Sequence, residues 1–214
     1  MDDLNNVIDH FPEVGEIIQI KPLTSGLINQ TYLVQTKSVT DPDYILQCIN
    51  HHIFTDVDML QHNIEAVTSH IRQKLEEAHE DDIDRKVLRF VKADNGKTYY
   101  FDGEKYWRMS VFIPGSQTLD VVTPDSSYLV GLKFGEFEAM LADMTESLGE
   151  TIPDFHNMEV RLKQLREAVQ QDAVGRMEKV HTLVADIEKD AEEMCCAVRL
   201  YRVGTLTKRV CHCD

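Results

Sequence analysis

The feature that most constrains the fold of this chain is a change in hydrophobic period after residue 113. Before that point, apolar residues alternate along short segments bounded by turn residues, as in half-buried β-strands. After it, apolar residues recur at steps of three and four, as on one face of an α-helix. The sequence therefore predicts an α+β fold with a strand-rich lobe, residues 1–113, and an all-helical lobe, residues 114–214.

Six strands are expected in the first lobe. They are residues 16–23, 31–36, 44–49, 86–92, 98–101 and 105–113. The pairs Asn95-Gly96 and Asp102-Gly103 favour tight two-residue turns, because glycine tolerates a positive φ. These turns predict that the last three strands form an antiparallel meander.

A long helix is expected between the third and fourth strands. Its apolar stripe repeats at helical spacing and consists of Leu60, Ile64, Val67, Ile71 and Leu75. Thr55 is a suitable N-cap, with Asp58 three residues further on. The stretch "EEAHEDDIDR" that follows is predicted to be a solvated acidic face of this helix.

Three helices are expected in the second lobe. The first follows Thr123, a capping residue, and has Pro124 at its first position. The second begins after Asn157, another capping residue. The third is predicted as one continuous helix from Met177 to Tyr201, ended by Gly204.

The charge of the chain argues against two classes of partner. With 37 acidic and 22 basic residues its net charge is −15, which repels nucleic acid and anionic membranes. No run of about 18 apolar residues occurs, so no membrane span is predicted. The N-terminal stretch "MDDLNNVIDH" lacks the layout of a secretory signal, and five irregularly spaced cysteines suit reduced thiols. A cytoplasmic protein is expected.

Two stretches of the first lobe suit a nucleotide. "PLTSGLINQTYLV" places Gly26 and Asn29 between two strands, where backbone N–H groups can hold phosphate; the alternative is an ordinary hairpin. In "YILQCIN", Gln47 stands where a two-lobed kinase carries a lysine that pairs with a glutamate of the next helix. Glu65 is placed to face it. The alternative for Gln47 is a polar residue on one face of a half-buried strand.

The junction of the lobes and the C-terminal stretch carry further alternatives. In "RMSVFIPG", backbone groups of Phe112 and Ile113 can contact an adenine edge, or the segment is merely an edge strand leaving a sheet. "VCHCD" ends on Asp214 and contains H-x-D, the start of a phosphotransferase catalytic loop. Its alternative is a metal site with the ligands Cys211, His212, Cys213, Cys195 and Cys196, although adjacent helical cysteines point about 100° apart.

Several long segments, in this order, resemble the N-acetylhexosamine 1-kinase-like branch of the aminoglycoside phosphotransferase family, which has a protein-kinase-like fold. They are "GLINQTYLV" (26–34), "YILQCIN" (44–50), "IFTDVDMLQHNIEAVT" (53–68), "FGEFEAML" (134–141), "ETIPDFHNMEVRL" (150–162) and "RVCHCD" (209–214). The resemblance covers nearly the whole chain. It implies an ATP-dependent kinase for a small sugar.

The resemblance also implies roles for individual residues. Gly26 and Asn29 would lie in the nucleotide-phosphate loop, Gln47 would take the place of the lysine, and Phe112 and Ile113 would form the hinge beside adenine. With Glu65 these are the candidate nucleotide-binding residues. Asp214 would be the catalytic base that activates the anomeric hydroxyl of N-acetylglucosamine or N-acetylgalactosamine. Ligands for Mg²⁺ are expected beyond Asp214, and His156 is expected to be structural.

These features lead to one main hypothesis and two alternatives. The chain is expected to be an N-terminal fragment of a sugar kinase that binds ATP and is inactive by itself. One alternative is a non-catalytic kinase-like binding module. The other is a mucin-desulfating protein, which the stretch "CCAVR" disfavours because Ala197 stands where the sulfatase motif has proline. Choline, homoserine and an aminoglycoside stay open as acceptors beside the hexosamines.

Overall fold

The computed structural model describes residues 2–24, 26–116 and 121–211 of the 214-residue chain. Its backbone divides into two compact units. The second unit is Ile152–Val210, and the first unit holds the rest of the described chain. No helix within these described ranges is both long enough and apolar enough to cross a membrane. The division into lobes at residues 113 and 114 stays a prediction.

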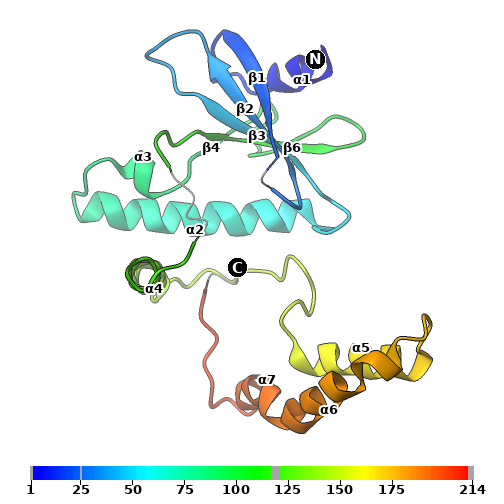
Figure 1. Ribbon diagram of the computed structural model, residues 1–214. Coiled ribbons are helices and arrows are strands. Elements are labelled where there is room, and N and C mark those ends of the chain that lie inside the picture. The colour runs from blue at the N-terminus through cyan, green and yellow to red at the C-terminus, as the bar shows by residue number, and fades with distance from the viewer. Residues whose placement is uncertain (1, 25, 117–120, 212–214) are drawn as a thin grey trace. The chain divides into compact units, whose positions relative to one another are not determined.

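A six-stranded antiparallel sheet forms the centre of the first unit (Figure 1). Its strands are β1 (Ile17–Leu23), β2 (Gln30–Thr36), β3 (Tyr44–Ile49), β4 (Phe90–Val91), β5 (Tyr100–Phe101) and β6 (Tyr106–Val111). The strand order is β1-β2-β3-β6-β4, and β5 also pairs with β6. Strand β6 therefore has β3 along one edge, and β4 and β5 one after the other along the opposite edge.

The predicted meander of the last three strands is wrong in its pairing, although its two turns form. Gly96 has a φ of 78° and Gly103 a φ of 104°, the conformation for which glycine is favoured. However, β4 and β5 both pair with β6. The reason is that the intervening segment turns toward the long helix α2, to which Thr98 and Tyr99 are hydrogen-bonded.

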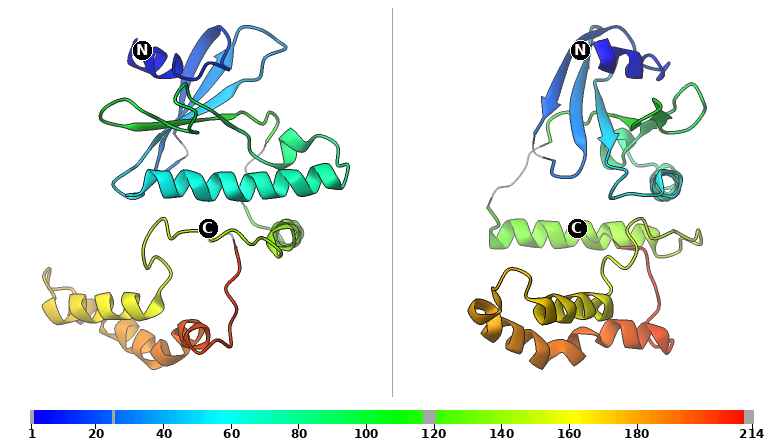
Figure 2. Two further views of the ribbon diagram at one scale, coloured as in Figure 1. Left: turned by 180° about the vertical axis from the view of Figure 1, so that it is seen from behind. Right: turned by 90° about the vertical axis from the view of Figure 1, so that its right-hand side faces the viewer.

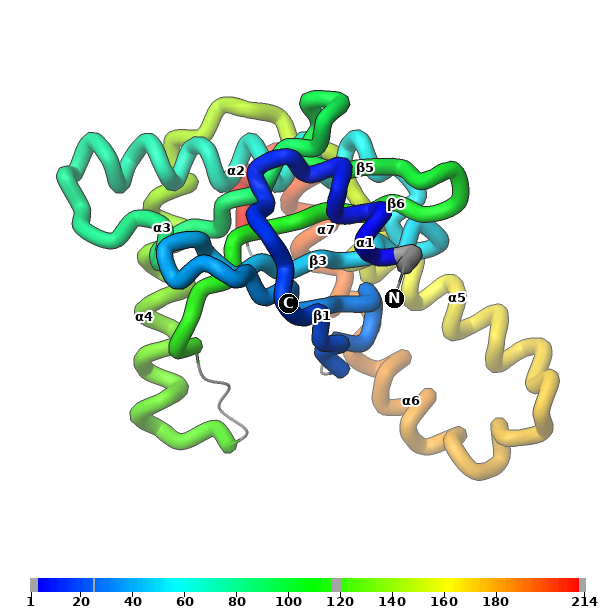
Figure 3. Tube along the Cα trace, turned by 90° about the horizontal axis from the view of Figure 1, so that it is seen from above, coloured from blue at the N-terminus to red at the C-terminus, as the bar shows by residue number. Residues whose placement is uncertain are grey.

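Helix α1 (Asp2–Ile8) packs on one face of this sheet, as the view from above shows (Figure 3). Strand alternation sends every second side chain of the sheet toward this face. The apolar core formed there consists of Val7, Ile8, Phe11, Val34, Tyr44, Leu46, Val91, Ala93, Trp107 and Met109, all buried. This core holds the sheet and the N-terminal segment together.

Helix α2 (Val57–Glu77) packs on the opposite face of the sheet (Figure 2). Its apolar contacts with that face form a second, smaller cluster of Ile49, Val57, Leu60 and Tyr99. The predicted N-cap at Thr55 is wrong by one residue. Asp56 is extended and its carboxylate accepts the Met59 N–H at 2.9 Å, so Asp56 caps the helix.

The acidic stretch after α2 does not extend the helix. Helix α2 ends at Glu77, and a one-turn helix, α3 (Ile83–Lys86), forms before β4. The predicted strand 86–92 is accordingly shortened to Phe90–Val91. Positive φ values at His79 and Asp82 mark the turn between α2 and α3.

Helix α4 (Pro124–Leu141) also belongs to the first unit. It begins as predicted, with Thr123 and Ser126 forming a capping box and Pro124 at the first position. Past its C-terminus, Asp143 accepts hydrogen bonds from Lys74 Nζ at 2.8 Å and His70 Nε2 at 3.1 Å, both on α2. These contacts attach α4 and the segment after it to α2.

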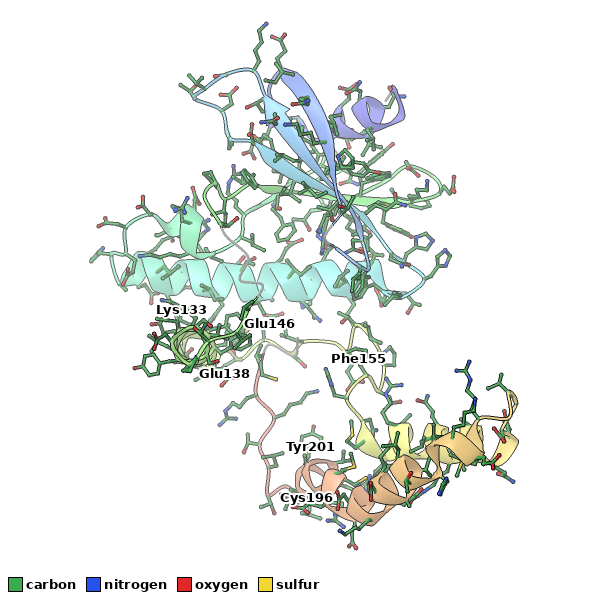
Figure 4. All side chains as sticks on the ribbon, in the orientation of Figure 1. Lys133, Glu138, Glu146, Phe155, Cys196 and Tyr201 are labelled. Atoms are coloured by element: carbon green, nitrogen blue, oxygen red, sulfur yellow. The ribbon has the colours of Figure 1, made fainter. Side chains whose placement is uncertain are left out.

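The second unit consists of α5 (Met158–Gln171), α6 (Met177–Met194) and α7 (Cys196–Arg202). Asn157 caps α5 as predicted, but the expected continuous helix 177–201 is wrong. Cys195, with φ −84° and ψ 0°, interrupts it, and its N–H points at the carbonyls of Ala191 and Glu193. Cys196 and Tyr201 then lie on α7 (Figure 4).

Ion pairs connect the three helices of the second unit. Arg166 on α5 binds Glu188 on α6 at 2.6 Å, and Arg202 on α7 binds Glu159 on α5 at 2.7 Å. All four side chains are at least one-third exposed, so solvent screens these pairs and they add little to stability.

Candidate functional site

The α2-facing side of the sheet carries a cluster of polar side chains. The pleat of β3 directs Gln47 to this side, and the pleat of β6 does the same for Arg108. The two residues are direct partners in the antiparallel register of β3 and β6. Arg108 Nε donates a hydrogen bond to Gln47 Oε1 at 3.0 Å.

Helix α2 completes this cluster from the other side. Gln61, with only 2% of its surface exposed, accepts a hydrogen bond from Arg108 Nη1 at 3.1 Å. Its amide nitrogen donates to the Thr98 hydroxyl at 2.9 Å. The Thr98 hydroxyl in turn donates to Glu65 Oε1 at 2.5 Å, so one turn of α2 carries both polar anchors.

The cluster also reaches the loop between β1 and β2. Gln47 Nε2 donates to the Thr31 hydroxyl at 3.2 Å, and that hydroxyl donates to the Asn29 carbonyl at 3.5 Å. The Asn29 side chain accepts the Asn50 N–H at 2.9 Å, which ties the loop to the end of β3. We call this connected set the Arg108 network; it comprises Asn29, Thr31, Gln47, Gln61, Glu65, Thr98 and Arg108.

Arg108 is the only cation of the Arg108 network. Its acceptors are two neutral amide oxygens, and no carboxylate of a described residue lies within ion-pair distance of it. Burial lowers the pKa of Arg108 to about 10, so the guanidinium remains charged at neutral pH. Its carbon Cζ lies 5.6 Å from the centre of the Phe90 ring. Part of the Arg108 surface nevertheless remains exposed to solvent.

The structure brings three of the predicted nucleotide-site residues into the Arg108 network. Asn29, Gln47 and Glu65 all belong to it, but Gln47 and Glu65 are not hydrogen-bonded to each other. Arg108, Gln61 and Thr98 lie between them in the chain of contacts. Gly26 precedes Asn29 in the loop, where an added Cβ would make only ordinary contacts, the nearest at 3.6 Å to the Asn29 carbonyl.

The predicted hinge residues follow directly after β6. Phe112 donates its N–H to the Asp43 carbonyl at 2.8 Å, which continues the pairing beside β3 by one residue. Among the residues that the structure describes, the Ile113 N–H has no acceptor and its carbonyl no donor. Ile113 therefore offers a donor and an acceptor, the pattern that an adenine edge requires.

The predicted catalytic base, Asp214, lies outside the described residues, as do His212 and Cys213. Within the described residues, no group of three His, Cys, Asp or Glu side chains is close enough to hold a metal ion. The described residues do not test the Mg²⁺ ligands that the resemblance implies. Both roles stay predictions.

Two surface hollows adjoin the Arg108 network. One, of about 250 Å³, is lined by Asp58, Gln61, His62, Glu65, Gly96, Lys97 and Tyr99. In it, hydrogen bonds from Lys97 and Tyr99 lower the pKa of Asp58, whereas burial raises the pKa of Tyr99. The other, of about 230 Å³, is lined by Glu65, Thr68, Ser69, Arg72, Leu88, Arg89, Phe90, Lys92 and Thr98. Glu65 is thus shared by the network and both hollows.

The sequence-based list of site residues omits four members of the Arg108 network: Thr31, Gln61, Thr98 and Arg108. One signal for Arg108 was available. In the stretch "YWRMSV", apolar Trp107 and Met109 alternate with Arg108, so the pattern places a charge on one face of a central strand. Gln61 lies beside the apolar stripe of α2 and gives no such signal.

No protein-family model matches this chain. Among solved structures, it is similar to the crystal structure of an aminoglycoside phosphotransferase from Alicyclobacillus acidocaldarius subsp. acidocaldarius DSM 446. The TM-score is 0.53 at 13% sequence identity, over 92% of this chain and 53% of that one. A second match is spectinomycin phosphotransferase, APH(9)-Ia, solved with ADP and spectinomycin, with a TM-score of 0.42 at 12% identity, over 90% and 57% of the chains.

This chain therefore spans about half the length of the solved structures that it matches. At this identity, the likeness to the first of them concerns the fold alone. It confirms the prediction of an α+β, protein-kinase-like fold with an antiparallel sheet, one long helix and a helical remainder. The fold of this chain is thus similar to that of the aminoglycoside phosphotransferase from Alicyclobacillus acidocaldarius.

Proposed function

We propose that this chain forms the nucleotide-binding part of an ATP-dependent phosphotransferase that acts on a small hydroxyl acceptor. The observation that carries the proposal is the Arg108 network on the α2-facing side of a kinase-like sheet. In protein kinases this side holds a lysine on the third strand and a glutamate on the following helix, which position the ATP phosphates. Here Gln47 and Glu65 occupy the corresponding strand and helix.

The remaining roles of the proposed site follow the sequence resemblance. Gly26 would lie beside the phosphates, Phe112 and Ile113 beside adenine, and Asp214 would accept the proton of the attacking hydroxyl. Mg²⁺ would be bound by residues that follow Asp214. The proposed acceptor is the anomeric hydroxyl of N-acetylglucosamine or N-acetylgalactosamine, and the proposed location is the cytoplasm.

Nucleotide binding is the first test. The chain has one tryptophan, Trp107, which is 5% exposed and lies on β6 next to Arg108, so its fluorescence reports on the first unit. We expect ATP to raise the midpoint of thermal unfolding in a concentration-dependent way, because a ligand that binds only the folded state stabilises it. Isothermal titration calorimetry with ATP and adenosine gives the affinities. Absence of any binding at millimolar ATP would contradict the proposal.

The acceptor is tested separately. The protein is incubated with ATP, Mg²⁺ and one acceptor at a time, and products are identified by ³¹P NMR. We expect a sugar 1-phosphate from an N-acetylhexosamine. A product formed only with an aminoglycoside, choline or homoserine would overturn the proposed acceptor and leave the phosphotransferase activity standing.

One observation favours a second candidate function, a non-catalytic nucleotide-binding module. Gln47 brings no charge to the position where kinases have a lysine. ATP binding without a phosphorylated product for any of these acceptors would support this second candidate.

A further inference from the structure

We propose that Arg108 is a phosphate-binding residue, which supplies the positive charge that Gln47 lacks. This inference rests on the proposed function, because the phosphates are those of the bound nucleotide. In this arrangement the charge comes from β6 instead of β3. Gln47 becomes a positioning residue that holds the guanidinium.

The place of Arg108 in the sheet supports this assignment. Arg108 is the direct register partner of Gln47 across the β3–β6 ladder, and the two side chains are hydrogen-bonded at 3.0 Å. Side chains directly opposite each other on one face of an antiparallel pair have Cβ atoms about 5 Å apart, so a ligand group near Gln47 is also within reach of the longer arginine. In kinases the cation is a lysine on the third strand, whereas here it is Arg108 on the adjacent strand β6. Both positions are close to the same ligand group.

The hydrogen-bond inventory of Arg108 leaves room for an anion. A guanidinium has five N–H donors, and two of them, on Nε and Nη1, are used by the amides of Gln47 and Gln61. Among the described residues no carboxylate pairs with it; the one carboxylate in the network, Glu65, is separated from it by Gln61 and Thr98. Three donors are therefore available to oxygen atoms of a ligand.

Electrostatics favour an oxyanion at this point. A cation that is partly removed from water and lacks a counter-charge is unfavourable by itself, as its lowered pKa of about 10 reflects. Phosphate oxygens bind the planar guanidinium in a bidentate manner and would neutralise its positive charge. The two glutamine amides restrict rotation of the guanidinium, so the remaining donors are oriented before the ligand arrives.

A purely structural role is the competing explanation. If Arg108 served only to link β3 to α2, its removal would destabilise the protein and leave the preference for phosphorylated ligands unchanged. If it binds phosphate, its removal weakens phosphorylated ligands more than adenosine. Either role allows some loss of stability, because the amides of Gln47 and Gln61 lose a donor, so ligand preference is the measurement that separates the two roles.

The experiment compares the full chain with Arg108→Gln and Arg108→Lys. Calorimetry measures the affinity for ATP, for tripolyphosphate and for adenosine, and Trp107 fluorescence measures unfolding. We expect Arg108→Gln to lower the affinity for ATP and for tripolyphosphate about 10- to 100-fold, as expected for the loss of a charged hydrogen bond. The affinity for adenosine should change less than about threefold. Arg108→Lys should keep part of the affinity for ATP and tripolyphosphate, because lysine keeps the positive charge but cannot bind phosphate in a bidentate manner.

Lys37→Gln is the matched control. It removes one positive charge from an exposed pair with Glu16 at the far end of β2 and should leave all three affinities unchanged. ATP binding that is equal in the wild type and in a folded Arg108→Gln variant overturns the inference and leaves the proposed function intact. A wild type that binds neither ATP nor adenosine overturns the proposed function itself, so the two failures are distinguishable.

Discussion

The two faces of the sheet in the first unit are built on different principles. On the α1 side, Val34, Leu46, Val91 and Met109 have no exposed surface and contact apolar neighbours. On the α2 side, the centre is occupied by Gln47, Gln61 and Arg108. The first face stabilises the fold by burying apolar area; the second places polar groups where a fold alone would favour apolar ones.

The buried side-chain nitrogen and oxygen atoms of the polar face are nevertheless hydrogen-bonded. Among the described residues, no buried side-chain nitrogen or oxygen lacks a partner. A satisfied polar network of this kind orders side chains but adds little net stability, because each hydrogen bond replaces one with water. Under the proposed function, the polar face would bind the ligand, whereas the apolar face supplies most of the stability. Substitutions on the polar face should then change ligand affinity, and those on the apolar face should change the free energy of unfolding.

The largest expected effect comes from the apolar face. Leu46→Ala removes a fully buried side chain from the core, and we expect the free energy of unfolding to fall by about 2–5 kcal/mol. Denaturant unfolding followed by Trp107 fluorescence measures it. Val39→Ala, at a residue that is fully exposed, is the control and should change stability by less than about 0.5 kcal/mol. Equal losses of stability for Leu46→Ala and Val39→Ala would show that the apolar face does not stabilise the fold in the way described.

A smaller effect is expected on the polar face. Gln61→Leu leaves Arg108 and Thr98 each without one partner, which should cost about 1–3 kcal/mol. Combination with Arg108→Met should cost less than the sum of the single changes, because the guanidinium that lost its acceptor is gone. A double-mutant cycle in urea gives this coupling. Strict additivity would show that the two side chains do not act together.

The position of α2 beneath the polar face can be tested at its N-cap. Asp56→Ala removes the acceptor of the Met59 N–H and should reduce stability by about 1 kcal/mol. Thr55→Ala serves as the matched change one residue earlier and should be close to neutral. The same unfolding assay applies, and a larger loss for Thr55→Ala would restore the original sequence-based prediction.

The smallest expected effect concerns pH. Burial opposes ionisation of Asp102, but hydrogen bonds from the Lys105 and Glu104 N–H groups and from Trp107 Nε1 prevail and lower the pKa of Asp102. A lowered native pKa means that its stabilising contribution is complete above the unfolded value of about 3.9 and is lost as the pH falls through the native pKa. Because Asp102 is exposed, the contribution is below about 1 kcal/mol.

Asp102→Asn is the corresponding variant. Unfolding free energies measured between about pH 2 and pH 5 should fall less steeply with acidification in Asp102→Asn than in the wild type. Identical slopes would show that the contacts of Asp102 with the turn and with Trp107 add no pH-dependent stability.

Much of the first unit was predictable because its patterns are local. The first three strands lie within one residue of their predicted starts and ends, since alternation and turn residues define them. The caps Thr123 and Asn157 were correct for the same reason. At the start of α2, by contrast, Thr55 and Asp56 are both good capping residues, and only the backbone conformation decides between them.

The parts that were not predictable depend on contacts between distant residues. Arg108 and Gln47 are 61 positions apart, and their meeting requires the β3–β6 register, which alternation alone does not fix. The hydrogen bond between Thr98 and Gln61 on α2 likewise joins residues that are far apart in the sequence, so local patterns do not predict it. The break at Cys195 lies in a segment of regular helical spacing without glycine or proline, so the sequence contains no local stop signal.

The hydrogen bonds of the Arg108 network all point the same way. Starting at Arg108, each group donates to the next, outward through Gln47 on one branch and through Gln61 to the Glu65 carboxylate on the other. On the Gln61 branch the dipoles of the neutral groups are therefore aligned between a cation and an anion, an arrangement in which each bond strengthens its neighbours. The Gln47 branch ends at the neutral Asn29 carbonyl. A flip of either amide would set donor against donor, so the guanidinium fixes the polarity of both branches.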